Sequence, residues 1–327
     1  MTFTVIDAPS YIDALRTLLP RAHKRIVLTA MVILRGPRTD EVLLPLLAAA
    51  KRGVTVHVLL DTYTFSPISR PPYLDVTEFK QAVADTRQFF EELRAAGGTV
   101  SIVGAMGLNP YAGRYHAKIA VVDDEVFTFG GVNLRDDCFD NVDYMLRATD
   151  AGLADTLEHI AAKNSHGQPV RDLEQQLDPD NTLLFDAGQK HESIIFKRAC
   201  ELTSQAQRVT YISQMAPTGR LAKALRGTKA TYYANQPSKT GWSPDTMAQW
   251  FDQHTNGLKN HYEGTPYIHA KLILYELKNG KKALLSGSHN FSWRGVAFGT
   301  KEIALCSYDE QLWRQLHDVV YTVATAA

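Results

Sequence analysis

A short motif, His-Ala-Lys, occurs twice in this chain of 327 residues. The first copy spans His116 to Lys118, and the second, which begins 153 residues later, spans His269 to Lys271. Each copy is followed at a short distance by an asparagine, Asn133 or Asn290. A repeat of reactive residues at such long spacing indicates that the chain contains two copies of one structural unit.

The residues after each motif predict a pair of strands. Lys118 is followed by Ile-Ala-Val-Val, and Lys271 is followed by Leu-Ile-Leu-Tyr. Both are short apolar runs that end at residues typical of turns. A second apolar run follows each, at residues 126–129 and 283–285, and leads into a Gly-x-x-Asn sequence. Because alternate residues of a strand point to the same side, the histidine and lysine of each copy can face one anion.

Helices and strands alternate in the same way in both halves. We expect strand, helix, strand, helix and strand at residues 2–7, 10–22 with Ser10 as N-cap, 25–34, 40–52 and 54–60. The second half repeats this order at residues 182–185, 191–205, 208–214, 216–226 and 229–234, and residues 85–96 form a further amphipathic helix. This alternation predicts an α/β fold with mixed or parallel sheets flanked by helices.

The polar stretch 163–180 is the expected boundary between the repeats. We therefore predict an N-terminal domain, 1–165, and a similar C-terminal domain, 166–327. A pseudo-twofold axis would bring the two His-x-Lys segments together, with the active site at the interface.

The paired motifs resemble those of the phospholipase D superfamily, whose members carry His-x-Lys followed by an acid, Gly-Gly/Ser-x-Asn and a later carboxylate. The first copy matches with His116, Lys118 and Asp123, and the second with His269 and Lys271, but with Glu276 in place of aspartate. The run after Asn133 is similar to the cardiolipin synthase branch of phosphatidyltransferases. The resemblance implies two phospholipase D-like αβ-sandwich domains, and it implies that the acid after each motif supports its strand rather than contacting phosphate.

The resemblance also assigns roles to residues outside the two motifs. Asn133, Asn290 and Ser288 would bind the substrate phosphate, and Asp143 and Glu302 would orient the histidines. The first copy has Gly131 at the position of Ser288, so it offers no hydroxyl there. We include Asp123 and Glu276 with His116, Lys118, His269 and Lys271 as candidate catalytic residues.

The expected chemistry follows from these residue types. The two ammonium groups and the amides would neutralise and hold a phosphodiester, one imidazole would attack phosphorus, and the other would protonate the leaving alkoxide. Family resemblance implies a phosphohistidine intermediate with His116 as nucleophile and His269 as general acid, whereas the sequence alone leaves the two roles interchangeable. No metal and no cofactor are expected, because the two lysines supply the positive charge.

Composition limits the class of substrate. Lys and Arg together number 35, as do Asp and Glu, so the chain has no overall basic field of the kind that holds nucleic acid. A content of 45% apolar and 21% charged residues is typical of a globular protein. Three scattered cysteines, Cys138, Cys200 and Cys306, indicate neither a disulfide framework nor a zinc cluster.

Membrane and targeting signals are absent from the pattern. No stretch reaches the roughly 18 apolar residues of a membrane span, and the N-terminus does not resemble a signal peptide. We expect a cytoplasmic protein, or one associated peripherally with a membrane, that reaches a phospholipid substrate from the bilayer surface.

Two segments interrupt the symmetry of the halves. Residues 62–74 mix aromatic residues with three prolines, and they either line an acyl-chain path or pack on the domain beneath. Residues 235–264 contain Trp242, Trp250, Phe251 and Tyr262, and form either a substrate lid or a packed excursion.

The predicted function is phosphatidyl transfer or hydrolysis on phospholipids. A phosphodiesterase that cleaves nucleic acid uses the same residues and is the alternative, and an inactive phosphate-binding module is a third. An apolar path beside the histidines favours lipid, and a basic groove with flanking aromatics favours nucleic acid.

Overall fold

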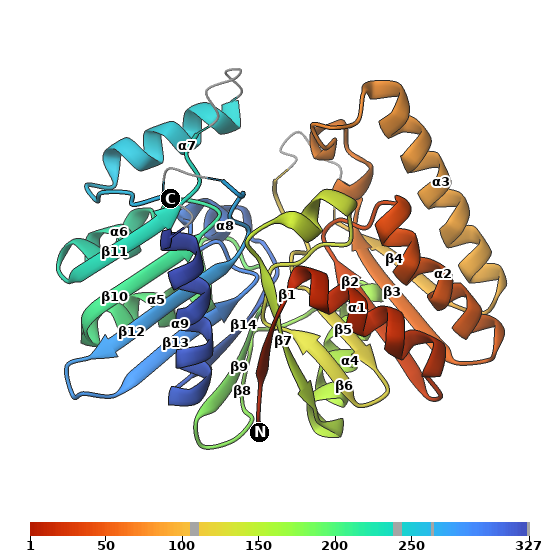
Figure 1. The fold of residues 1–327 in the computed structure, drawn as a ribbon, viewed down its shortest axis with the longest axis horizontal. Helices are drawn as coiled ribbons and strands as arrows, with labels where there is room; N and C mark the ends of the chain where they lie inside the picture. Colours follow the sequence, from red (N-terminus) through yellow and green to blue (C-terminus); the bar gives the residue numbers. More distant parts are fainter. Residues whose placement is uncertain (105–110, 238–243, 263–264, 326–327) are drawn as a thin grey trace.

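The computed structural model of the protein describes residues 1–104, 111–237, 244–262 and 265–325. Its described strands form two seven-stranded sheets, one in each half of the chain (Figure 1). The first sheet contains β1 (Thr4–Asp7), β2 (Arg25–Ala30), β3 (Thr55–Asp61), β4 (Thr99–Val103), β5 (Ile119–Val122), β6 (Glu125–Thr128) and β7 (Tyr144–Thr149). The second contains β8 (Leu173–Gln176), β9 (Asn181–Asp186), β10 (Ala206–Ser213), β11 (Lys229–Ala234), β12 (Lys271–Leu277), β13 (Lys282–Gly287) and β14 (Glu302–Ser307).

Helices flank both sheets. They are α1 (Ala8–Leu18), α2 (Pro37–Lys51), α3 (Val76–Ala95), α4 (Ala151–Ser165), α5 (Ile194–Gln205), α6 (Gly219–Arg226), α7 (Pro244–Thr255), α8 (Trp293–Phe298) and α9 (Glu310–Thr325). Short 3-10 helices span Leu19–Arg21, Thr62–Phe65, Pro67–Ser69 and Asp136–Asp140. The predicted α/β class with mixed sheets is confirmed.

The two sheets share one strand order. The order β1-β7-β6-β5-β2-β3 of the first sheet corresponds to β9-β14-β13-β12-β10-β11 of the second. In both sheets the last pair, β2 with β3 or β10 with β11, is parallel, and the other pairs of this set are antiparallel. Strand β4 extends the first sheet beyond β3, and β8 extends the second beyond β9.

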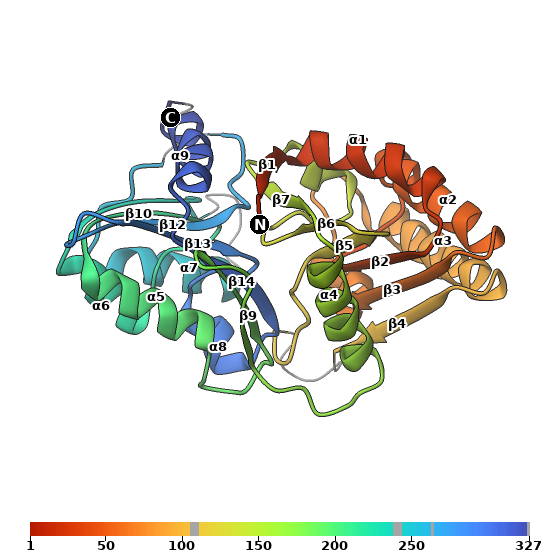
Figure 2. The same cartoon turned by 90° about the horizontal axis from the view of Figure 1, so that it is seen from below.

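The core has three layers of packing because alternate strand residues face opposite sides of each sheet. In β2, Ile26 and Leu28 pack beneath α1, α2 and α3, whereas Val27 faces α4 and the second half. The apolar cluster that contains Val27 extends without a break into β9, β12, β13 and α9 of the other half. A separate cluster packs α5 and α6 on the outer face of the second sheet. The view in Figure 2 shows these layers, with α4 between the sheets.

Several predicted boundaries are wrong for local reasons. The N-cap of α1 is Asp7, whose carboxylate accepts the Ser10 N–H at 2.8 Å, rather than Ser10 itself. Strand β2 ends at Ala30, because the Val32 N–H bonds the Asn133 side chain and Ile33 pairs with Leu134.

Two helix boundaries also differ from those predicted, and the domain boundary is untested. Helix α2 begins three residues earlier than expected and continues through Pro45. Helix α3 begins at Val76 rather than at residue 85, because Asp75 caps it there in a capping box with Glu78. Strand β8 lies inside the stretch expected to separate the repeats, so the proposed division at residue 165 stays a prediction.

Candidate active site

Each His-x-Lys segment lies at one edge of its sheet, where the chain enters a central strand. Lys118 immediately precedes β5, whose first residue, Ile119, pairs with Thr29 near the end of β2. Lys271 begins β12 and pairs with Ser213, the last residue of β10. The two motifs therefore occupy equivalent positions in the two halves.

Each histidine is hydrogen-bonded to a carboxylate from the opposite half of the chain. The Nδ1 of His116 lies 2.9 Å from an oxygen of Glu302, and the Nδ1 of His269 lies 2.7 Å from one of Asp143. Because a carboxylate only accepts, each Nδ1 carries the proton, and the lone pair of the neutral ring is on Nε2. Both imidazoles are thus arranged for either attack or proton transfer through Nε2.

Backbone hydrogen bonds next to these pairs hold the two halves in register. The His116 N–H donates to the Lys301 carbonyl at 2.8 Å, one residue before Glu302. The His269 N–H donates to the Val142 carbonyl at 3.0 Å, one residue before Asp143. Short parallel bridges, Tyr115 with Lys301 and Val142 with Ile268, complete both connections. The position of each carboxylate relative to its imidazole is therefore fixed by main chain as well as by side chain.

Both lysines are buried beside the histidines. Lys118 is 1% exposed and its Nζ donates to the His116 carbonyl at 2.6 Å, while the Nζ of Lys271, which is fully buried, donates to the His269 carbonyl. Burial, reinforced by the charge of Lys271, lowers the pKa of Lys118 to about 7. Burial lowers the pKa of Lys271 to about 8, although Asp143 and Glu302 oppose this. The site therefore contains two poorly solvated cationic groups, a suitable environment for an anion.

The histidines are shifted in the same direction. Burial lowers the pKa of His116 to about 4 despite the opposing effect of Glu302. Burial and the charge of Lys271 lower the pKa of His269 to about 3. For Glu302, burial alone would raise the pKa, but the charge and hydrogen bond of His116 lower it to about 2. In the absence of substrate both rings are neutral at neutral pH.

The candidate phosphate-binding residues have different surroundings. Asn133 is buried, and its Oδ1 accepts the Val32 N–H at 3.3 Å. The Oδ1 of Asn290 is buried without a hydrogen-bond partner among the described residues. The Ser288 hydroxyl donates to Glu302 at 2.5 Å and accepts the Ile303 N–H at 3.0 Å. Ser288 thus holds the orienting carboxylate rather than presenting its hydroxyl to phosphate.

Gly131 is required by a close approach. A Cβ at this position would lie 2.6 Å from Asp143 Oδ1 and 2.7 Å from the His269 carbonyl oxygen. Its N–H instead donates to Asp143 at 3.2 Å. The departure from serine in the first copy thus accompanies a different way of holding the carboxylate: a backbone N–H for Asp143 and a hydroxyl for Glu302.

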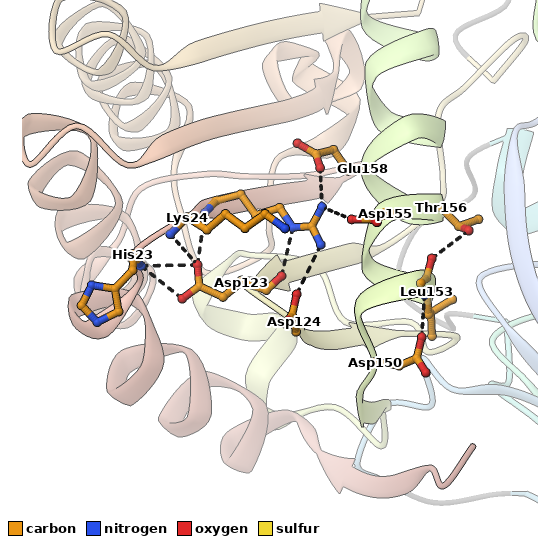
Figure 3. A network of polar contacts seen from close by, with 11 residues as sticks. His23, Lys24, Asp123, Asp124, Asp150, Leu153, Asp155, Thr156 and Glu158 are labelled. Carbon is orange, nitrogen blue, oxygen red and sulfur yellow. Dashed lines mark hydrogen bonds and ion pairs between the residues drawn. The ribbon is translucent and has the colours of Figure 1, made fainter.

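Asp123, included above as a candidate catalytic residue, lies away from the histidines at the other end of β5 (Figure 3). Its carboxylate accepts the backbone N–H groups of His23, Lys24 and Arg25 at 2.8–3.3 Å. These bonds outweigh the effect of burial and lower its pKa. Asp123 thus fixes the turn to the start of β2, which agrees with the supporting role implied by the family resemblance.

Figure 3 also shows the neighbouring ion-pair network of Asp124, Asp155 and Glu158, which all contact the Arg25 guanidinium. Glu276, the acid of the second copy, is partly exposed on β12 and lies 3.8 Å from Arg208. The structure therefore places neither acid of the two motifs at the site, and their assignment as catalytic is corrected.

The sequence reasoning missed two supports of the site. His289 is buried, its Nδ1 accepts the Phe291 N–H at 2.8 Å, and its charge helps to lower the pKa of Glu302. Its position inside the Gly-x-x-Asn sequence of the second copy was the available signal. Asp61, buried at the end of β3, accepts the Tyr115 N–H at 2.7 Å and so holds the residue before His116. Asp61 lies far from the motif in sequence, and only the fold brings them together.

Across the described parts of the chain, no three His, Cys, Asp or Glu side chains gather so that they could hold a metal ion. Nor does any described helix have the length and apolar character needed to cross a membrane.

Known proteins resemble this chain in two ways: a family model matches part of its sequence, and solved structures match its fold over nearly the whole chain. A family model described as "Cardiolipin synthase, PLD-like domain" matches residues 15–163. A phosphatidylserine synthase from Haemophilus influenzae Rd KW20 has a similar structure, with a TM-score of 0.72 at 13% identity, over 99% of this chain and 86% of that chain. No curated protein matches in sequence.

Two other solved structures share the fold. A polyphosphate kinase from Porphyromonas gingivalis gives a TM-score of 0.62 at 13% identity over 97% of this chain, which spans only 46% of the kinase. A yeast tyrosyl-DNA phosphodiesterase mutant gives 0.51 at 10% identity, over 95% of this chain and 91% of that chain. At such identities the likeness shows the fold alone.

Residues 15–163 thus resemble the phospholipase D-like domains of the cardiolipin synthase family model, and the chain as a whole has the fold of the phosphatidylserine synthase structure.

Proposed function

We propose that the protein cleaves a phospholipid phosphodiester through a phosphohistidine intermediate and transfers the phosphatidyl group to water or to an alcohol. The observation that carries this proposal is the crossed arrangement of His116 with Glu302 and His269 with Asp143, beside two buried ammonium groups. Two imidazoles of matched tautomer are suited to a reaction in which one attacks while the other transfers a proton.

In the first step, the Nε2 lone pair of His116 attacks phosphorus and forms a P–N bond. The P–O bond to the leaving alcohol breaks, and its oxygen takes the proton of a protonated His269. The negative charge of the bound phosphodiester raises the pKa of His269, offsetting the burial that lowers it in the empty site. Lys118 and Lys271 stabilise the charge on the non-bridging oxygens.

In the second step, neutral His269 removes a proton from the acceptor, whose oxygen attacks phosphorus. The P–N bond breaks and His116 regains its lone pair. Water as acceptor gives hydrolysis, and a lipid hydroxyl, glycerol or an amino alcohol gives transfer. His116 is assigned as nucleophile by family resemblance.

A substrate with a nitrophenolate leaving group distinguishes the two histidines, because nitrophenolate departs without a proton. With bis(p-nitrophenyl) phosphate, we expect His269→Ala to release a burst of nitrophenolate equal to the enzyme present and to accumulate an acid-labile phosphohistidine. We expect His116→Ala to give no burst, and His159→Ala, an exposed histidine on α4, to behave as wild type. A burst from His116→Ala alone would reverse the two roles.

The substrate class is tested with mixed anionic and zwitterionic liposomes beside a single-stranded DNA digest. New phospholipids or phosphatidic acid, detected by mass spectrometry and lost in His116→Ala, would support the proposal. DNA cleavage without lipid products would reassign the enzyme to nucleic acid, and no product from either would favour a phosphate-binding module.

A further inference from the structure

Exposed apolar side chains gather in two segments of this protein. Among the described residues, eleven large apolar side chains are exposed, and seven of them lie in residues 62–76 or in the described part, 244–262 and 265–268, of a second segment. We name these the first and second docking segments. Their exposed fractions run from 45% to 60%, and the residues are Ile68, Tyr73 and Val76 in the first and Met247, Trp250, Phe251 and Tyr267 in the second.

Both docking segments leave the sheets at the edge that carries the catalytic residues. The first follows β3, whose Leu60 pairs with Ala30, next to the Thr29 that faces Ile119. The second follows β11, whose last residue, Ala234, pairs with the same Ser213 that pairs with Lys271. Figure 1 shows α7 and the orange segment before α3 on the same upper side of the two halves.

Helix α7 is amphipathic with its apolar face turned outward. Met247, Trp250 and Phe251 follow the spacing of one helix face, which ordinarily packs against a core. The polar side faces the protein instead: Asp252 pairs with Arg294 of α8, and Gln253 donates to the Asn235 carbonyl. A surface hollow of about 510 Å³ adjoins this helix, lined by Met247, Ala248, Phe251, Asp252 and Arg294. Polar contacts thus hold the helix while its apolar face meets solvent.

The charge of these segments decides between occupants. Residues 62–76, 244–262 and 265–268 together contain two Lys or Arg and three Asp or Glu. A nucleic acid would require an excess of positive charge along its path. An outward helix face of Met, Trp and Phe, with exposed Tyr and aliphatic side chains in the same two segments, is instead typical of a surface that inserts into the boundary between lipid headgroups and acyl chains.

We infer that the two docking segments form a bipartite surface that binds a lipid bilayer and places the sheet edges that carry the catalytic residues against it. This inference rests on the proposed function, because the phosphodiester of a phospholipid lies at the boundary between headgroups and acyl chains that the docking segments would contact. Because the segments come from both halves, contact at two points would orient the site toward the membrane.

The test is binding to vesicles of phosphatidylcholine, alone or mixed with phosphatidylglycerol, measured by flotation. We expect Trp250→Ser/Phe251→Ser and Ile68→Ser/Tyr73→Ser each to weaken binding about 10-fold or more. The matched control is Leu44→Ser/Tyr321→Ser, which removes two exposed apolar side chains outside the docking segments and should bind as wild type. Unchanged melting temperatures would show that the variants are folded.

The inference would be overturned if the wild-type protein bound neither kind of vesicle. It would also be overturned if the docking variants bound vesicles as well as wild type does. A wild-type dimer that dissociates on docking substitution would likewise overturn the inference, because the segments would then contact a second copy of the chain. His116→Ala should bind vesicles as wild type does, since binding needs no turnover.

Binding and turnover separate the two proposals. Vesicle binding that depends on the docking segments but gives no lipid products would refute the proposed function and still support the inferred bilayer-binding surface. Cleavage of a monomeric short-chain phospholipid without vesicle binding would do the reverse. If both hold, the docking variants should lose activity on vesicles and retain it on the short-chain lipid.

Discussion

His116 and His269 each depend on a carboxylate from the other half, but the two pairs are built differently. Asp143 is held by the N–H of Gly131, and Glu302 by the Ser288 hydroxyl. The longer glutamate leaves room for a side chain at residue 288, whereas the shorter aspartate brings residue 131 close to its oxygens. The asymmetry is therefore a coordinated change of two residues in each half.

Substitution of either orienting carboxylate by its amide should impair catalysis. In Glu302→Gln and Asp143→Asn, the amide donates as well as accepts, so it no longer fixes the proton on Nδ1 or stabilises the imidazolium. We expect kcat to fall by about 10²- to 10⁴-fold, the range for general acid–base groups, with little change in melting temperature. Steady-state kinetics with thermal melts measure both effects, and wild-type kcat in either variant would refute the orienting role.

Gly131→Ala tests the close approach in the first half. The added methyl group would collide with Asp143 and the His269 carbonyl, so we expect a loss of activity of at least about 10-fold and a lower melting temperature. Ser288→Ala is the comparison, because it removes one hydrogen bond without adding atoms. If Gly131→Ala matched wild type in rate and melting temperature, the space would not be limiting.

At the level of elements, the turn between β5 and β6 anchors β5, the strand that follows the first His-x-Lys segment. Asp123 has a φ of +55°, a left-handed conformation that Asn tolerates better than Ala. We expect Asp123→Ala to reduce the free energy of unfolding by about 1–3 kcal/mol, because three backbone N–H groups lose their acceptor. Asp123→Asn should lose less.

Denaturation curves at several pH values would measure this effect, with kcat of the folded fraction as the second readout. Because the folded pKa of Asp123 is lowered, its stabilising effect is complete above the pKa of the unfolded chain, near 4, and declines as pH falls through the folded value. The Ala variant and wild type should therefore converge in acid. A large fall in kcat without a loss of stability would restore Asp123 to the catalytic set.

The sequence predicted the central elements well because repeated motifs and apolar runs are local signals. The apolar runs after the two motifs predicted strands at the positions of β5 and β12. The repeated motif placed His116 and His269, with their lysines, at equivalent positions in the two halves. The sequence could not show that Asp143 serves His269 or that Glu302 serves His116, since that pairing depends on how the two sheets face each other. The capping box of α3 and the pairing of β8 with β9 were missed because their residues carry little apolar periodicity.

The whole molecule is organised around an apolar cluster shared by both sheets and a site to which both halves contribute. An anion bound between Lys118 and Lys271 would link the halves and restore the charge that burial disfavours. Since burial lowers the lysine pKa values to about 7 and 8, anion binding should raise them again. Proton uptake should therefore accompany binding near pH 8, and affinity should fall as pH rises further.

Sulfate, a permanent dianion near neutral pH, is a suitable probe. We expect sulfate to raise the melting temperature, and calorimetry in buffers of different ionisation enthalpy to detect proton uptake at about pH 8. Lys118→Met and Lys271→Met should reduce both effects, while Lys163→Met, an exposed lysine on α4, should not. Binding without proton exchange would contradict the assigned charge states.

The crossed carboxylates also bear on how this chain can evolve. Each half carries the histidine of one pair and the acid of the other, so an ancestor consisting of a single half would have needed a second copy to complete either pair. After fusion, a change at residue 302 affects His116 in the opposite half as well as Ser288 in its own half. A foreign half in place of either repeat would therefore have to supply both a histidine and an orienting carboxylate to preserve the two pairs.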